Sequence, residues 1–190
     1  MIERKFANMQ VTRECNNECV FCSNPQFKKI YSLEAAKKTV SELKKRGITD
    51  IYLSGGEPTL SPFLIEIILF LKSSGINPFV ITNGVKLEEK DLVNRIYNAG
   101  LREIHVSVHS HKEDIAKKLS QKKGHFEKSL KGIRNLLLRG LDVKINSTIN
   151  SLNCKELTNF AEFFVRNFPE IKHFVFNFLD PGHADGTLKS

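Results

Sequence analysis

Residues 33–53, LEAAKKTVSELKKRGITDIYL, contain one complete unit of helix, glycine and strand. Apolar residues recur at helical spacing from residue 33 onward, which predicts a helix over 33–46 with Ser32 as its N-cap residue. Gly47 suits the left-handed position after that helix. The β-rich run at 48–53 then predicts a strand.

The same unit recurs along the rest of the chain. Ser61 and Pro62 suit the N-cap and the first turn of a second helix, which Gly75 would end. Further helices are expected near 87–99 and 126–139, before Gly100 and Gly140, and Asn153 is expected to cap an aromatic-rich helix that runs to about residue 168. The predicted strands are NMQVT (8–12), ITDIYL (48–53), INPFVIT (76–82), LREIHVSV (101–108), LDVKINSTI (141–149) and IKHFVFNF (171–178).

Six strands that alternate with five helices favour right-handed crossovers and a parallel sheet, so the fold class is α/β. Two architectures satisfy this pattern: an open doubly wound sheet, and a partial barrel of six parallel strands with outer helices. The periodicity of the sequence does not choose between them.

Polar residues gather where the predicted strands end. The carboxyl ends of parallel strands form one edge, and chemistry in such folds takes place there. We therefore expect one active site on this rim. The segments that reach it are CNNECVFC (15–22), SGGEP (54–58), TNG (82–84), SVHSH (107–111), the alternating Lys144, Asn146 and Thr148, and finally Asn177 and Asp180.

The composition is that of a single globular domain, which we expect to cover residues 1–190. The chain is 41% hydrophobic and 26% charged. The N-terminus lacks the apolar segment of a signal peptide, and the longest apolar run, FLIEIILFL at 63–71, is interrupted by Glu66 and too short to span a bilayer. We therefore expect a cytoplasmic protein without membrane contact.

The formal net charge is +8, and basic residues are dense in residues 111–134. An acidic partner is conceivable, but a solvated helical face is the favoured interpretation. Nucleic acid is an unlikely partner, because Phe126 is the one aromatic residue near this charge and single-stranded binding surfaces combine charge with stacking rings.

Three of the four cysteines, Cys15, Cys19 and Cys22, lie within eight positions. A structural zinc ion needs four ligands, so the histidines at 105, 109 and 111 would have to complete the site. A thioredoxin-type pair would use Cys19 and Cys22 and leave Cys15 unexplained. A 4Fe–4S cluster is normally held by four thiolates, so three from one loop would leave one iron open for another ligand, or the distant Cys154 would be the fourth.

The three cysteines and the motifs at the later strand ends are the basis of a resemblance. In these residues the chain resembles the radical S-adenosylmethionine (SAM) superfamily. The resemblance implies a partial (β/α)6 barrel and a 4Fe–4S cluster whose open iron is chelated by SAM. Reduction would cleave SAM to methionine and a 5′-deoxyadenosyl radical, which takes a hydrogen atom from a substrate. The matching segments are Cys15, Cys19 and Cys22 with Phe21, then GGEP (55–58), TNG (82–84), VSVHS (106–110) and VKINSTIN (143–150).

The resemblance assigns roles to individual residues. Gly55 and Gly56 would let the backbone approach the methionine part of SAM, and Glu57 would accept from its ammonium group. Phe21 would lie against adenine. Ser107 resembles a ribose or carboxylate contact.

Several further residues match with less definite roles. Asn146 and Leu179 correspond to positions that flank SAM, whereas Lys144 could meet an acidic substrate group or be a solvated rim residue. His109 and His111 could be rim groups, a proton donor or structural residues. Cys154 opens the last predicted helix and has no assigned role.

The resemblance also implies partners. A reductant such as ferredoxin or flavodoxin would supply the electron. Many relatives continue past the sixth strand into a domain that covers the barrel mouth, whereas only DPGHADGTLKS (180–190) follows here. We expect either a minimal core, a truncated chain that lacks a C-terminal extension, or a subunit whose site is covered by a partner subunit or a protein substrate. The expected substrate is a peptide or a cofactor precursor, and the alternative is a non-catalytic iron–sulfur electron-transfer or binding protein on the same fold.

Overall fold

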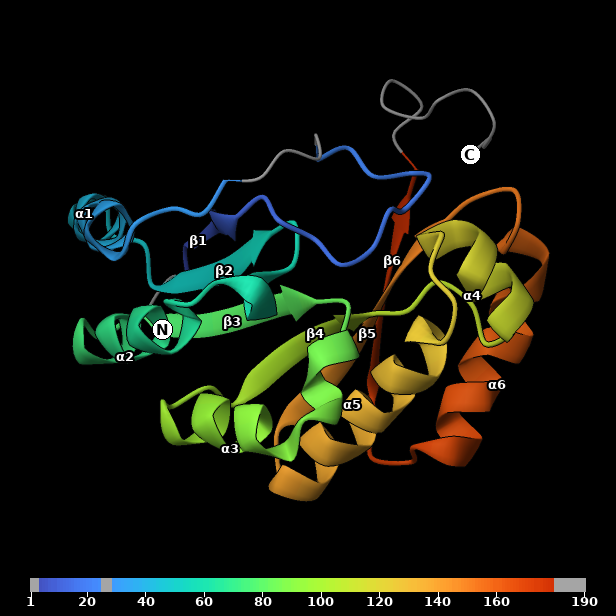
Figure 1. Ribbon diagram of the computed structural model, residues 1–190. Coiled ribbons are helices and arrows are strands. Elements are labelled where there is room, and N and C mark those ends of the chain that lie inside the picture. Colours follow the sequence, from blue (N-terminus) through green and yellow to red (C-terminus); the bar gives the residue numbers. More distant parts are fainter. Residues whose placement is uncertain (1–3, 25–28, 180–190) are drawn as a thin grey trace.

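The computed structural model describes residues 4–24 and 29–179 (Figure 1). One parallel sheet contains six strands in the sequential order β1-β2-β3-β4-β5-β6. A doubly wound sheet reverses its strand order partway, whereas a strip of a β/α barrel keeps the chain order. The partial barrel is therefore the correct one of the two architectures. The strands are β1 (Phe6–Thr12), β2 (Asp50–Gly55), β3 (Asn77–Thr82), β4 (Glu103–Ser107), β5 (Asp142–Ile149) and β6 (His173–Phe178), and all six predicted strands are confirmed.

The helices pack against one another around the outside of the sheet, with α1 on α2, α2 on α3 and α3 on α5. The α-helices are α1 (Leu33–Lys45), α2 (Leu64–Ser73), α3 (Lys90–Asn98), α4 (Glu113–Ser120), α5 (His125–Arg139) and α6 (Leu157–Asn167). Short 3-10 turns are η1 (Pro58–Leu60), η2 (Val85–Glu88) and η3 (Cys154–Glu156). Within the described part of the chain, no helix is long and apolar enough to cross a membrane.

Ser32 caps α1 as predicted, because its Oγ accepts from the backbone N–H of Ala35 at 3.2 Å. The predicted start of the second helix is wrong. Residues after Glu57 first form the turn η1, and Ser61 accepts a hydrogen bond from the N–H of Phe63 at 3.4 Å. The helix α2 then begins at Leu64.

The prediction for Asn153 is also wrong. Its side chain caps no helix, and instead donates to the carbonyls of His109 and Thr148, both at 2.8 Å. The sequence count of five helices missed α4, which is short and strongly charged. Its apolar residues are few: Ile115, Ala116 and Leu119.

The two faces of the sheet differ in character. Alternate strand residues such as Leu53, Val106 and Ile145 are fully buried in the core formed with the helices. The residues between them point to the opposite, concave face, because successive side chains of a strand alternate. Strand register aligns them in levels: His105, Lys144 and His173 share one level, and Ser107, Asn146 and Val175 share the next level toward the carboxyl rim.

Candidate functional site

The cysteine loop, residues 13–24, follows β1 and lies along the carboxyl edge of the sheet (Figure 1). Its first residues are bonded to the turn after β2. The N–H of Gly56 donates to the Thr12 carbonyl at 2.9 Å, and the N–H of Glu57 donates to the Glu14 carbonyl at 2.7 Å. These bonds fix the loop on the rim where the sequence predicted the site.

The three thiols occupy different environments within the loop. Cys15 and Cys19 are half-buried and Cys22 is exposed. Burial raises the pKa of the Cys19 thiol to about 12, and the neighbouring Cys15 and Cys22 add to this rise. Burial also raises the pKa of Cys15. Metal ligation requires thiolates, so iron has to displace these protons when it binds.

The arrangement of donors does not suit a single zinc ion. Among residues 4–24 and 29–179, no three Cys, His, Asp or Glu side chains are grouped as they would be around one ion. The three candidate histidines have other neighbours: His105 bonds to Glu103 at 3.1 Å, His109 accepts from Thr148, and His111 lies 3.9 Å from Glu156. A 4Fe–4S cluster places its thiolates on separate irons, and the assignment of Cys15, Cys19 and Cys22 as its ligands stays a prediction.

Gly55 and Gly56 are required by the chain's own packing. A Cβ at Gly55 would lie 2.0 Å from the Thr12 carbonyl oxygen, and one at Gly56 would lie 2.2 Å from that of Glu14. Both contacts are far shorter than van der Waals distance. The reason for glycine seen in the structure is therefore the close approach of the cysteine loop, and the expected approach of SAM stays a prediction.

Glu57 is 1% exposed, and its carboxylate is surrounded by donors of this chain. Its Oε1 accepts from the Thr59 N–H at 3.0 Å and from the Thr59 and Thr82 hydroxyls, each at 2.6 Å. Its Oε2 accepts from the Asn83 N–H at 2.7 Å. Glu57 thus holds the ends of β2 and β3 together, and its predicted contact with an ammonium group stays a prediction.

Phe21 and Leu179 lie in contact, and their expected places beside SAM stay predictions. Phe21 packs in a small apolar cluster with Leu179 and with Leu119 of α4. The Phe21 ring also meets the His109 ring edge-on, with centroids 4.6 Å apart and planes at 73°. His109 accepts at Nδ1 from the Thr148 N–H at 3.0 Å, which leaves Nε2 to carry its proton.

The cysteine loop is also bonded to α4, a contact that was not predicted from the sequence. The N–H groups of Glu18 and Val20 donate to the carbonyls of Ser120 and Leu119, both at 3.0 Å. No motif in the sequence signals these backbone bonds, because they depend on where α4 ends in space.

Asparagines add a second set of contacts that the sequence analysis did not assign. Asn17 bonds to His125 at 2.5 Å, and Asn83 donates to Asn16 at 2.6 Å. The pair of asparagines inside CNNECVFC was the available signal.

Ser107 and Asn146 share one level of the concave face, and Asn177 donates to the Asn146 side chain at 2.7 Å. Lys144 lies one level deeper. It is paired within the chain, because its Nζ lies 2.6 Å from Glu103 Oε1, which also bonds to His105. Lysine and histidine together hold the pKa of Glu103 below its usual value, although burial opposes this.

Two predicted features lie apart from this group. Cys154 is exposed in η3, with its Sγ 3.9 Å from the Ser151 carbonyl oxygen. Asp180 and the segment 180–190 lie outside the described residues.

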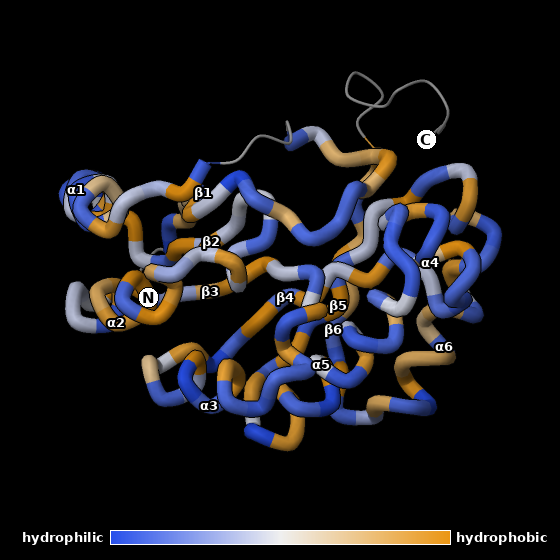
Figure 2. Tube along the Cα trace, in the orientation of Figure 1, coloured by the Kyte–Doolittle hydropathy of each residue, from blue (hydrophilic) through white to orange (hydrophobic). Residues whose placement is uncertain are grey.

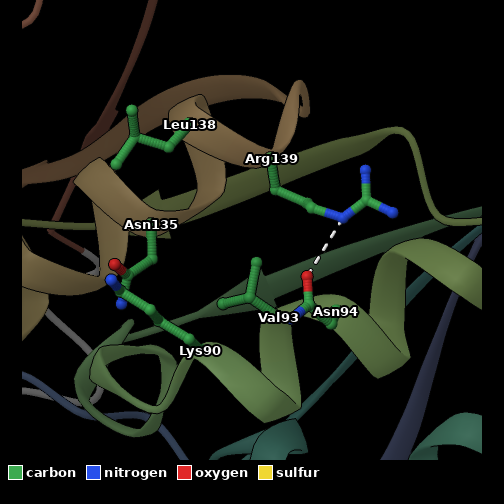
Figure 3. A pocket seen from close by; sticks show the side chains of 6 residues that line it. All are labelled: Lys90, Val93, Asn94, Asn135, Leu138 and Arg139. Atoms are coloured by element: carbon green, nitrogen blue, oxygen red, sulfur yellow. Dashed lines mark hydrogen bonds between the residues drawn. The ribbon is translucent and has the colours of Figure 1, made fainter.

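Figure 3 shows a pocket of about 160 Å³ between α3 and α5, on the helical side of the sheet. Arg139 crosses it and donates to Asn94 at 3.0 Å. The same guanidinium stacks 3.6 Å from the centroid of the Tyr97 ring. None of the predicted site residues lines this pocket, which is a packing feature of the helix layer.

The fold and the thiol loop together define a parallel β/α domain with three clustered thiols on its carboxyl rim. The sequence model of the Radical SAM superfamily matches residues 9–163, and the chain belongs to this superfamily. Its members are enzymes that use a 4Fe–4S cluster together with SAM.

Individual relatives support this membership. The chain is 34% identical over 157 residues to a probable GTP 3′,8-cyclase of Saccharolobus solfataricus, and 30% identical over 151 residues to an Fe-coproporphyrin III synthase of Methanosarcina barkeri. These matches cover 80% and 77% of this chain, but 50% and 37% of the relatives. A likeness in fold alone joins the chain to the crystal structure of Streptococcus suis SuiB bound to its precursor peptide SuiA, which superposes with a TM-score of 0.84 at 15% identity, over all of this chain and 43% of that one.

Proposed function

We propose that this chain is the radical-generating part of a radical SAM enzyme. Bound at the rim, the cluster and SAM would supply a 5′-deoxyadenosyl radical, which takes a hydrogen atom from a substrate. The observation that carries the proposal is a loop with three thiols, fixed to the sheet by the glycine turn after β2 and to α4 by two backbone bonds. No fourth protein ligand belongs to this loop, which suits an iron that SAM itself completes.

The residues of the chain have separate tasks in this proposal. Cys15, Cys19 and Cys22 would hold the cluster. Phe21, in contact with Leu179 and with the His109 ring, offers an apolar ring within the loop for adenine. Ser107 lies at the carboxyl end of β4 on the concave face, where it can hydrogen-bond a hydroxyl or carboxylate of SAM.

The concave face is the proposed substrate surface. It presents side-chain amides, including the bonded pair Asn146 and Asn177, above the charged group formed by Lys144, Glu103 and His105. Such a surface suits a substrate rich in hydrogen-bonding groups. Peptides and cofactor precursors are the proposed substrate classes. The likeness in fold to SuiB, which was crystallised with its precursor peptide, supports a peptide. The sequence identity with the probable GTP 3′,8-cyclase and the Fe-coproporphyrin III synthase supports a cofactor precursor.

We also propose that further protein covers this face in the working enzyme. The chain spans about half the length, or less, of the curated relatives reported above. Radical chemistry requires exclusion of water and oxidants, and the rest of a longer protein, a partner subunit or a protein substrate would provide it.

The test is anaerobic reconstitution with iron and sulfide, reduction by dithionite, and measurement of 5′-deoxyadenosine after addition of SAM. We expect about four irons per chain and 5′-deoxyadenosine formation that rises when the true substrate class is added. GTP, a small-molecule fraction of cell extract and a peptide fraction are the three additions to compare. A cluster that forms but never cleaves SAM would favour the alternative, a non-catalytic iron–sulfur protein.

A further inference from the structure

The end of α4 and the turn after it form a strongly basic surface. Residues 117–123, KKLSQKK, contain four lysines and no acidic residue. Three of them, Lys117, Lys118 and Lys123, are exposed and pair with no acidic side chain of the described residues. We call residues 117–123 the basic turn. Figure 2 shows this part of α4 and its turn as largely hydrophilic.

The basic turn is bonded directly to the cysteine loop. Its carbonyls at Leu119 and Ser120 accept from Val20 and Glu18, the two residues that flank Cys19. The fourth lysine, Lys122, forms an ion pair with the carboxylate of Glu18. Lys117, Lys118 and Lys123 therefore lie within four positions, along the chain, of the two carbonyls that hold the cysteine loop on either side of Cys19.

We infer that the basic turn is the docking surface for an acidic one-electron carrier protein. This inference rests on the proposed function, which requires one electron at the cluster for each SAM cleaved. One electron passes from the carrier to the cluster, so the carrier is oxidised and the cluster reduced by that single electron, with no proton involved. Electron transfer slows steeply with distance, so the carrier has to dock next to the cysteine loop.

Charge makes the basic turn the suitable place for this docking. A patch of one sign steers a partner of the opposite sign and orients it during encounter. The acidic residues of α4, Glu113 and Asp114, lie in its first turn, at the end away from the basic turn. The three exposed, unpaired lysines thus lie at the end of α4 that is bonded to the cysteine loop.

Nucleic acid is the weaker match for the same charge. Single-stranded nucleic acid binds to surfaces that add stacking rings to positive charge. Phe126 is half-buried and packs against Phe163, with ring centroids 6.3 Å apart, so it offers no free ring beside the lysines.

The first experiment measures binding of an acidic flavodoxin to the purified chain without its cluster. The test variant is K117E/K118E/K123E. The control is K38E/K44E/K45E on α1, which removes the same charge, likewise includes two last-turn lysines, and lies at the opposite end of the molecule (Figure 1). We expect the test variant to bind about tenfold or more weakly and with a smaller salt dependence, and the control to bind within about twofold of wild type.

The second experiment compares two electron sources after reconstitution. With reduced flavodoxin, 5′-deoxyadenosine formation by the test variant should fall about tenfold relative to the control. With dithionite, a small reductant that needs no docking surface, both variants should match wild type.

Equal flavodoxin binding and equal flavodoxin-driven rates in the two triple variants would overturn the inference. Loss of binding to a single-stranded RNA probe, with flavodoxin binding unchanged, would overturn it too and assign the lysines to nucleic acid. Failure of the proposed function is distinguishable from these outcomes, because in that case no variant forms 5′-deoxyadenosine even with dithionite.

Discussion

Glu57 joins two strand ends through a single carboxylate. It accepts four hydrogen bonds, three at Oε1 and one at Oε2, from residues after β2 and from the end of β3. Burial raises the pKa of this carboxyl despite these bonds, which favour the charged form. The turn after β2 is therefore held by a polar network with every partner inside the chain, and it offers the cysteine loop a rigid support.

Replacement of Cys19 by alanine should remove the cluster and leave the fold. The loop lies on the rim and contributes little to the main core, so far-ultraviolet circular dichroism should be unchanged. Reconstituted iron should fall to near zero. The matched control is Cys154→Ala, which changes an exposed thiol outside the loop and should keep the full iron content. Full iron in Cys19→Ala would contradict the assignment of the ligands.

His109 should make the stability of the chain depend on pH. Burial lowers its pKa from an ordinary 6.5 to about 4. Between these values the unfolded chain takes up a proton that the folded chain does not, so this contribution is present above pH 6.5 and is lost as the pH falls toward 4. The loss amounts to about 3 kcal/mol at most.

His109→Asn should flatten this part of the profile, because the amide does not titrate but can still accept from the Thr148 N–H. Urea unfolding of the cluster-free chain from pH 4 to 7 measures the effect. If the free energy of unfolding depended on pH in the same way in wild type and variant, His109 would have the same pKa in the folded and unfolded chain, which would contradict the prediction.

At the scale of elements, the turn after β2 and the cysteine loop depend on each other sterically. Gly56→Ala would place a Cβ 2.2 Å from a backbone oxygen, which cannot move aside as a flexible side chain would. We expect a loss of about 3 kcal/mol in the free energy of unfolding, together with faster proteolysis of the loop.

Gly47→Ala is the control for this prediction. Gly47 has a φ of 78° but open space around it, so alanine there meets only the backbone penalty of about 1 to 2 kcal/mol. If the two variants lost equal stability, the steric account of Gly56 would be wrong.

The periodic elements could be predicted from sequence, since strand runs and positive-φ glycines such as Gly75 and Gly140 are local signals. The start of α2 could not be predicted, because Glu57 and its partners impose a 3-10 turn first. The helix α4 was also not predicted, because it has few apolar residues. Those residues pack against Val20 and Phe21 of the cysteine loop and do not form the regular apolar stripe that signals a helix in a sequence.

The candidate site divides in the same way into features that local sequence signals predict and contacts that depend on distant segments. The clustering of three thiols on the carboxyl rim could be anticipated from their spacing and their place after the first strand, whereas the contact of Phe21 with Leu179 was not predicted. In contrast, the donors around Glu57 and the ion pair of Lys144 with Glu103 depend on register between strands that are far apart in the chain. Such contacts carry no signature in a single sequence.

At the scale of the whole molecule, one sheet separates a hydrophobic side from a polar side. Its helix-facing side is the hydrophobic core, and its concave side and carboxyl rim hold the polar groups, the thiols and the edge to which α4 is bonded. The arrangement places the three thiols and the proposed substrate surface away from the hydrophobic core.

The central claim is that SAM supplies the ligand that the three-cysteine loop lacks. The most direct measurement is electron–nuclear double resonance of the reduced, reconstituted chain with SAM labelled with ¹⁵N at its amino group. The account predicts a hyperfine coupling from the label to the cluster, which disappears when unlabelled SAM is used. A cluster signal that is the same with and without SAM would contradict the account.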